Sequence, residues 1–157
     1  MQPNLGLSGE QLKRVVEQLN PLLADESVLY AKVRNYHWNV TGPQFVTLHE
    51  LFEEHYGKLQ EIADDLAERA RSLGGRAIGT MKEFLEHSQL KEQPGEYPAA
   101  QEMCKRLLAD HETVIQRLRK AIEVCEEQDD EGTADMLTGF MEEHTKIAWM
   151  LRSLVEG

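Results

Sequence analysis

Basic residues are scarce in this sequence. The chain has 17 Lys and Arg against 28 Asp and Glu, which gives a formal net charge of −11. Such a chain repels phosphate backbones and attracts cations. The first fifteen residues carry only Lys13 and Arg14, and the last six carry Arg152 alone. This pattern predicts no basic arm that could wrap a duplex, so we expect no DNA binding and no retardation in a gel shift at low salt.

Long apolar runs are also missing. None approaches the roughly 20 residues that span a bilayer, and Met1-Gln2-Pro3-Asn4 lacks the features of a signal peptide. We therefore expect no membrane association and a cytoplasmic location. The two cysteines, Cys104 and Cys125, show no CxxC spacing. They are interpreted as small core residues, with a thiolate ligand as the alternative.

Aromatic residues make up only 6% of the 157 residues, and apolar residues recur mostly at steps of three and four. This periodicity favours helices over a sheet. The length and the 41% hydrophobic content suit one domain over residues 1–157. The sequence thus predicts an all-α protein.

Two long helices are predicted in the first half of the chain. Ser8 and Gln11 form a capping-box pattern, and the stripe that follows continues through Pro21 to about Asn39, which predicts a kinked but continuous helix. After the turn signal at 41–43, a second apolar stripe runs from Phe45 to the glycines at 74 and 75.

The second half predicts two more helices after a long crossover. Residues 76–98 break the pattern, apart from a possible short helix over 80–87, and apolar stripes then run over 103–125 and 136–154. We interpret the acidic run 126–132 as a solvated loop and Thr133 as the cap of the last helix. Together, these segments predict a ferritin-like four-helix bundle, with a short extra helix in the long crossover between helices 2 and 3.

A polar flank follows the second helix. At about 100° per residue, and with His49 at zero, Glu53 falls near 40°, Asp64 near 60° and Glu68 near 100°. The apolar residues of this helix centre near −80°, so the flank lies apart from the core. A solvated face is one interpretation. A metal site is the other, since histidine and carboxylate together suit iron or zinc.

The spacing decides how these groups could meet around one ion. His49 and Asp64 are separated by about 22 Å along the helix, so the pairs His49/Glu53 and Asp64/Glu68 cannot share an ion within one chain. Two copies packed antiparallel about a two-fold axis near Gly57 would bring each pair opposite the other. His37, near the end of the first helix, is also within reach. The predicted ligands are His37, His49 and Glu53 from one chain, with Asp64 and Glu68 from the partner.

The usual ferritin signature is absent. A di-iron site inside one bundle needs Glu-x-x-His on two helices, and none of the six histidines has a glutamate three residues before it. We therefore expect any metal site to lie between subunits.

Several motifs together resemble those of the Dps mini-ferritins, the DNA-binding proteins from starved cells. They cover nearly the whole chain: Tyr36-His37-Trp38-Asn39, His49-Glu50-Leu51-Phe52-Glu53, Ala67-Glu68-Arg69-Ala70, Leu73-Gly74-Gly75, Gly79-Thr80, Tyr97-Pro98, Thr133-Ala134-Asp135 and Trp149.

This resemblance implies a hollow homododecamer with ferroxidase sites at its two-fold interfaces. Such a protein oxidises Fe(II), preferably with hydrogen peroxide rather than dioxygen, stores Fe(III) as a mineral and protects against oxidative damage. Family ligands fall on His37, His49, Asp64 and Glu68, whereas Glu53 stands where the family usually has aspartate.

The resemblance also suggests roles for three residues outside the ligand set. Trp38 would be a one-electron donor, with core packing as its alternative. Asp130 and Asp135 would line a three-fold pore and draw in cations. Two other functions stay open, namely zinc binding at the same site and a purely structural bundle with a vestigial site.

Overall fold

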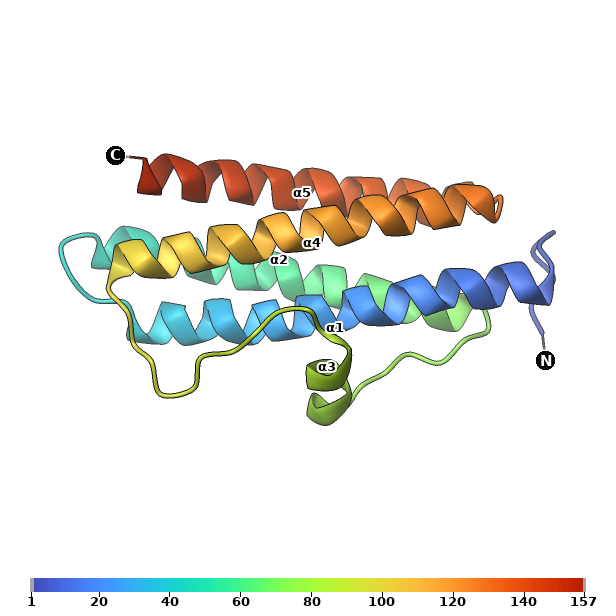
Figure 1. The fold of residues 1–157 in the computed structure, drawn as a ribbon, viewed down its shortest axis with the longest axis horizontal. Coiled ribbons are helices and arrows are strands. Elements are labelled where there is room, and N and C mark those ends of the chain that lie inside the picture. The colour runs from blue at the N-terminus through green and yellow to red at the C-terminus, as the bar shows by residue number, and fades with distance from the viewer. Residues whose placement is uncertain (1, 157) are drawn as a thin grey trace.

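Four long helices lie side by side in the computed structural model, which describes residues 2–156 (Figure 1). They are α1 (Gly9–Asn39), α2 (Phe45–Ser72), α4 (Ala100–Glu127) and α5 (Glu131–Val155), and the short α3 (Met81–His87) lies in the crossover. The described residues contain no strand. The all-α bundle with an extra short helix is therefore confirmed.

The first helix begins and ends as the sequence predicts. Ser8 caps it, with its hydroxyl accepting from the Gln11 N–H at 3.2 Å while the Gln11 side chain accepts from the Ser8 N–H at 2.9 Å. Pro21 lies inside the helix without ending it. The carbonyl oxygen of Pro21 accepts a hydrogen bond from Arg117 of α4, 3.3 Å away.

The glycines after α2 are required by geometry. Gly74 has φ +85°, a conformation that favours glycine. A Cβ on Gly75 would lie 2.5 Å from a methyl carbon of Val16, so only glycine lets the chain pass this close to α1. The end of α2 is thus fixed by both turn conformation and packing.

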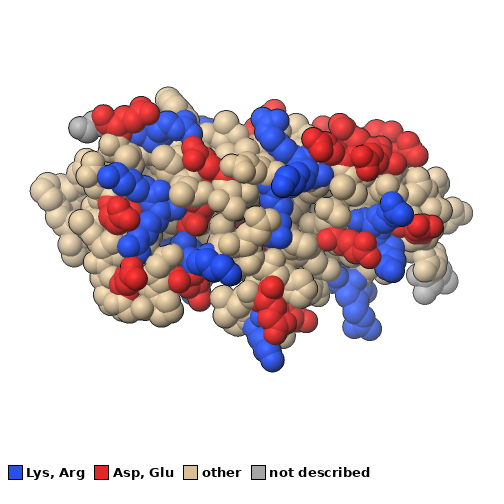
Figure 2. All heavy atoms as spheres, viewed as in Figure 1, with Lys and Arg blue, Asp and Glu red and all other residues tan. Residues whose placement is uncertain are grey.

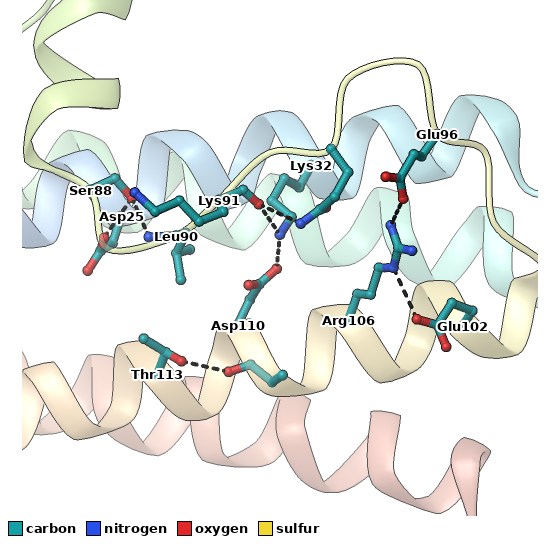
Figure 3. A network of polar contacts seen from close by, with 12 residues as sticks. Asp25, Lys32, Ser88, Leu90, Lys91, Glu96, Glu102, Arg106, Asp110 and Thr113 are labelled. Carbon is teal, nitrogen blue, oxygen red and sulfur yellow. Dashed lines mark hydrogen bonds and ion pairs between the residues drawn. The ribbon is translucent and has the colours of Figure 1, made fainter.

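The crossover runs the length of the bundle, so α2 and α4 point the same way (Figure 1). A buried polar network holds it in place (Figure 3). Asp25 of α1 accepts hydrogen bonds from the Ser88 hydroxyl and the Gln89 N–H, both at 2.8 Å. Lys32 donates to the Lys91 carbonyl at 2.9 Å and pairs with Asp110 of α4. The buried charged groups of this network, Asp25 and Lys32, thus have hydrogen-bond or ion-pair partners, without which burying a charge is costly.

The connection between α4 and α5 differs from the sequence prediction. The acidic run is mostly helical, because α4 continues to Glu127 and α5 begins at Glu131. The cap of α5 is Asp130 rather than Thr133: its carboxylate accepts from the Thr133 N–H at 3.0 Å and from the Thr133 hydroxyl. Exposed acidic side chains gather at this end of the bundle (Figure 2).

The core consists of apolar side chains from all four long helices. Cys104 and Cys125 are buried free thiols within it, as predicted. Among residues 2–156, no helix is long and apolar enough to cross a membrane.

Candidate metal centre

Two histidines meet where α1 leads into α2. Nδ1 of His37 lies 2.7 Å from the backbone oxygen of His49, and Nδ1 of His49 lies 2.8 Å from the backbone oxygen of His37. The rings stack with their centroids 3.8 Å apart and their planes inclined by 15°. The short connection over residues 40–44 therefore places the imidazole rings of His37 and His49 in direct contact.

These hydrogen bonds fix the tautomer of both rings. A carbonyl oxygen only accepts, so each Nδ1 must carry the hydrogen. A neutral ring held in this way has a bare lone pair on Nε2. Metal-bound histidines are oriented in this way, by a hydrogen bond from the second ring nitrogen. The pair therefore presents two nitrogen ligands in the form that a metal needs.

Aromatic neighbours hold the two rings in place. Phe45 stacks on His49 with centroids 5.1 Å apart, and the Tyr56 ring meets His37 edge-on at 5.3 Å. His37 itself is 7% exposed. The imidazoles are thus fixed by packing as well as by hydrogen bonds.

Glu53, Asp64 and Glu68 lie on the exposed surface of α2, with Glu53 one turn after His49. Among residues 2–156, none of the three carboxylates takes part in a hydrogen bond or an ion pair. Glu54, the residue after Glu53, pairs with Lys58 at 3.3 Å. The three predicted carboxylate ligands therefore keep their negative charge uncompensated within the chain.

One chain does not bring all five predicted ligands together. Within residues 2–156, no three His, Cys, Asp or Glu side chains are grouped closely enough to hold an ion. The length of α2 gives the reason, because it holds Asp64 and Glu68 far from His49.

The face of α2 near its middle is open. A Cβ on Gly57 would meet nothing within 4 Å, so packing within the chain does not require glycine there. A groove of about 720 Å³ lies beside it, lined by small residues such as Ala63 and Ala67 and also by Asp64. A second helix could approach closely along this face.

The remaining residues predicted to be functional are Trp38, Asp130 and Asp135, and they differ in burial and contacts. Trp38 is 62% exposed, with the Arg34 guanidinium 4.8 Å above its ring, so it does not pack in the core of its own bundle. Asp130 is 5% exposed and is committed to capping α5 and to Arg69, which donates to it at 3.0 Å. Asp135 is exposed. Of the two pore candidates, only Asp135 is free to face a channel.

Sequence reasoning missed a second polar cluster, inside the bundle. We define the buried histidine cluster as Glu26 of α1, His55 of α2, His111 of α4 and His144 of α5, each at most 1% exposed. The sequence pattern could have indicated that these residues are buried, because each of them falls on the apolar stripe of its helix. His55, for example, comes three residues after Phe52 and four before Leu59.

Burial keeps two of these histidines neutral. It lowers the pKa of His55 to about 4, where Glu54 acts in the opposite direction with a smaller effect. It also lowers the pKa of His111 well below its usual value, and the nearby His144 adds to this shift. Neither ring is charged near neutral pH.

Known proteins match this chain over nearly its full length. The ferritin-like domain family matches residues 16–157. A "DNA protection during starvation protein 2" of Bacillus anthracis is 44% identical, over 91% of this chain and 97% of that protein. The chain belongs to the Dps family of mini-ferritins.

Two further relatives extend the comparison. A low temperature-induced protein of a Nostoc species is 52% identical to this Dps protein, over 98% of this chain and 87% of the relative. The crystal structure of the Vibrio cholerae Dps protein, described as a ferritin-like diiron-carboxylate protein, superposes with a TM-score of 0.92. Its sequence is 33% identical, and the match covers 99% of this chain and 98% of that one.

Proposed function

We propose that this Dps protein is a ferroxidase that oxidises Fe(II) between subunits and stores Fe(III) inside a hollow homododecamer. Iron storage and protection are the themes of its family, and a ferritin-like diiron-carboxylate relative supports iron as the metal. The observation that carries the proposal is the His37/His49 pair, whose hydrogen bonds leave both Nε2 lone pairs free.

The proposed site joins two chains. His37, His49 and Glu53 of one subunit would face Asp64 and Glu68 of a two-fold partner, with the open face around Gly57 at the axis. Two nitrogen and three carboxylate ligands suit Fe(II), and the carboxylates also offset the charge of the product Fe(III). Glu53 has a longer side chain than the family's aspartate but offers the same donor group.

The chemistry is a two-electron reduction of peroxide by two iron ions. Two Fe(II), one H₂O₂ and two H₂O give two FeOOH units of mineral and four H⁺, which balances atoms and charge. Each Fe(II) loses one electron, and the O–O bond takes up both. Because the two electrons arrive at one site, no hydroxyl radical is released. The carboxylates of the chain bind and orient the substrate iron, and the exposed acidic surface attracts it.

Trp38 is proposed as a nearby one-electron donor. It follows His37 directly in sequence and is not enclosed in the core of its own chain. The Arg34 cation above its ring disfavours a positive charge on the indole. We therefore expect Trp38 to donate only when a single Fe(II) is bound, so that this iron supplies one of the two electrons that peroxide takes up and Trp38 supplies the other.

Entry of iron is proposed through three-fold pores that include Asp135. The net charge of −11 supports cation uptake and argues against DNA as a partner. Basic side chains are interspersed with acidic ones on the face drawn in Figure 2 and form no continuous stripe there.

Anaerobic titration with Fe(II), followed by peroxide, tests this function. We expect about two Fe(II) bound per site and one H₂O₂ consumed per two Fe(II), from the balance above, with growth of a ferric absorbance. Light scattering should give the mass of a dodecamer. A stable monomer, or zinc binding with no iron oxidation, would contradict the proposal.

A further inference from the structure

The buried histidine cluster is unusual for a protein core. Each of the four long helices contributes one of its members, and all four side chains are at most 1% exposed. It shares no residue with the proposed intersubunit site. His55 follows Glu53 by two residues and therefore points to the opposite side of α2.

A chain of hydrogen bonds fixes the hydrogens in part of the cluster. The carboxylate of Glu26 lies 2.6 Å from Nε2 of His144, so that nitrogen donates. In a neutral His144 ring Nδ1 is the acceptor, and Nδ1 of His111 donates to it at 2.8 Å. Nε2 of His111 remains as a bare lone pair.

Several polar atoms of the cluster have no partner among residues 2–156. They are both ring nitrogens of His55, Nε2 of His111 and Oε2 of Glu26. Leaving a buried polar group unpaired is destabilising, and apolar side chains of similar volume would avoid that cost. The spare nitrogens of two imidazoles, those of His55 and His111, therefore point to a ligand for nitrogen donors.

We propose that the buried histidine cluster binds one divalent transition-metal ion that favours imidazole, such as Zn²⁺ or Co²⁺, inside the bundle. The ion takes the place of the hydrogen between Nδ1 of His111 and Nδ1 of His144, and His55 supplies a third nitrogen. Three imidazoles with one open position form a known type of zinc site.

Two changes in side-chain position would create this geometry. In the present ring orientations, no three ligands within residues 2–156 converge. Two nitrogens bound to one tetrahedral ion at about 2.0–2.1 Å are separated by about 3.3 Å. Nδ1 of His111 and Nδ1 of His144 are 2.8 Å apart, so they need to part by about 0.5 Å. The His55 ring, whose centroid lies 6.3 Å from that of His111, must also turn about its Cβ–Cγ bond.

The proton count stays balanced. The hydrogen on Nδ1 of His111 moves to Nε2 of the same ring, and the imidazole stays neutral. His144 keeps its bond to Glu26, which orients the ring and offsets one of the two positive charges. Burial already holds the pKa of His111 low, so the ion does not compete with a proton for that ring.

Co²⁺ titration of an Asp64→Ala variant tests the proposal, because that background lacks one carboxylate ligand of every proposed intersubunit site. We expect one Co²⁺ per chain, with the intense visible absorption of low-coordinate cobalt, and a rise in Tm. Adding His111→Gln or His55→Gln should weaken Co²⁺ binding at least about tenfold. Adding His87→Gln, at an exposed histidine on α3, should change nothing.

Circular dichroism and native mass check that each variant folds. If His111→Gln does not fold, His55→Gln carries the test, because His55 makes no hydrogen bond among the described residues. Absence of Co²⁺ from the Asp64→Ala background would overturn the proposal, as would unchanged affinity in the glutamine variants. Equal Co²⁺ counts in the parent and Asp64→Ala would instead count against the intersubunit site.

Discussion

Purified His49→Ala and Asp64→Ala proteins are expected to lose peroxide-dependent iron oxidation by at least about 100-fold while still assembling. Each change removes one proposed ligand from every site. Neither side chain is in the core, since His49 is only half-buried and Asp64 is exposed, so the fold should persist. The measurement is the initial rate of ferric absorbance after peroxide is added to Fe(II)-loaded protein, with native mass as the check on assembly.

Asp65→Asn is the matched control for Asp64. Asp65 is also exposed on α2 but points about 100° away from Asp64, so its loss should leave the rate unchanged. If Asp64→Ala oxidises iron at the parent rate, Asp64 is not a ligand. If Asp65→Asn slows oxidation equally, the effect is one of surface charge.

The second large effect is a loss of stability at acid pH that depends on His55. Its pKa is about 4 in the folded chain and near 6.5 when unfolded. As the pH falls below 6.5, the unfolded chain binds a proton that the folded chain does not, and stability falls. The loss continues until the pH passes the folded pKa and totals on the order of 3 kcal/mol. Unfolding at pH 7 and pH 5, with chelator and at fixed protein concentration, measures the part of this loss between those two pH values, about 2 kcal/mol.

His55→Leu isolates this contribution. Leucine has a similar volume and no charge to desolvate, so the variant should lose less stability than the parent between pH 7 and pH 5. It should also be more stable at pH 7 by about 1 kcal/mol, because two unpartnered nitrogens are removed. His87→Leu, at an exposed position, should keep the parent's pH dependence. The same pH dependence in His55→Leu and the parent would show that His55 is not the acid-sensitive group.

The sequence was sufficient for those features that depend on local chemistry. Ser8 with Gln11 and the glycines at 74 and 75 mark helix ends through hydrogen bonds and backbone conformation, and the structure confirms them. The meeting of His37 and His49 followed from the short turn between their helices.

Features that depend on tertiary contacts were harder to predict. The N-cap of α5 went to Asp130 because Arg69, more than sixty residues away in sequence, pairs with its carboxylate. The buried histidine cluster has no signature within a single helix, since none of its histidines follows a glutamate by three residues. Its members instead come from four helices and meet only in the packed bundle.

Mixed assembly of two inactive variants tests the intersubunit site most directly. His49→Ala and Asp64→Ala chains, unfolded together in equal amounts and refolded, pair at random, and half the dimers contain one chain of each kind. In such a dimer one site lacks both residues and the other is complete. A site shared between two chains should restore about one quarter of the parent activity. If all ligands of a site came from one chain, no complete site could form, and a mixture as inactive as its components would show that the site is not intersubunit.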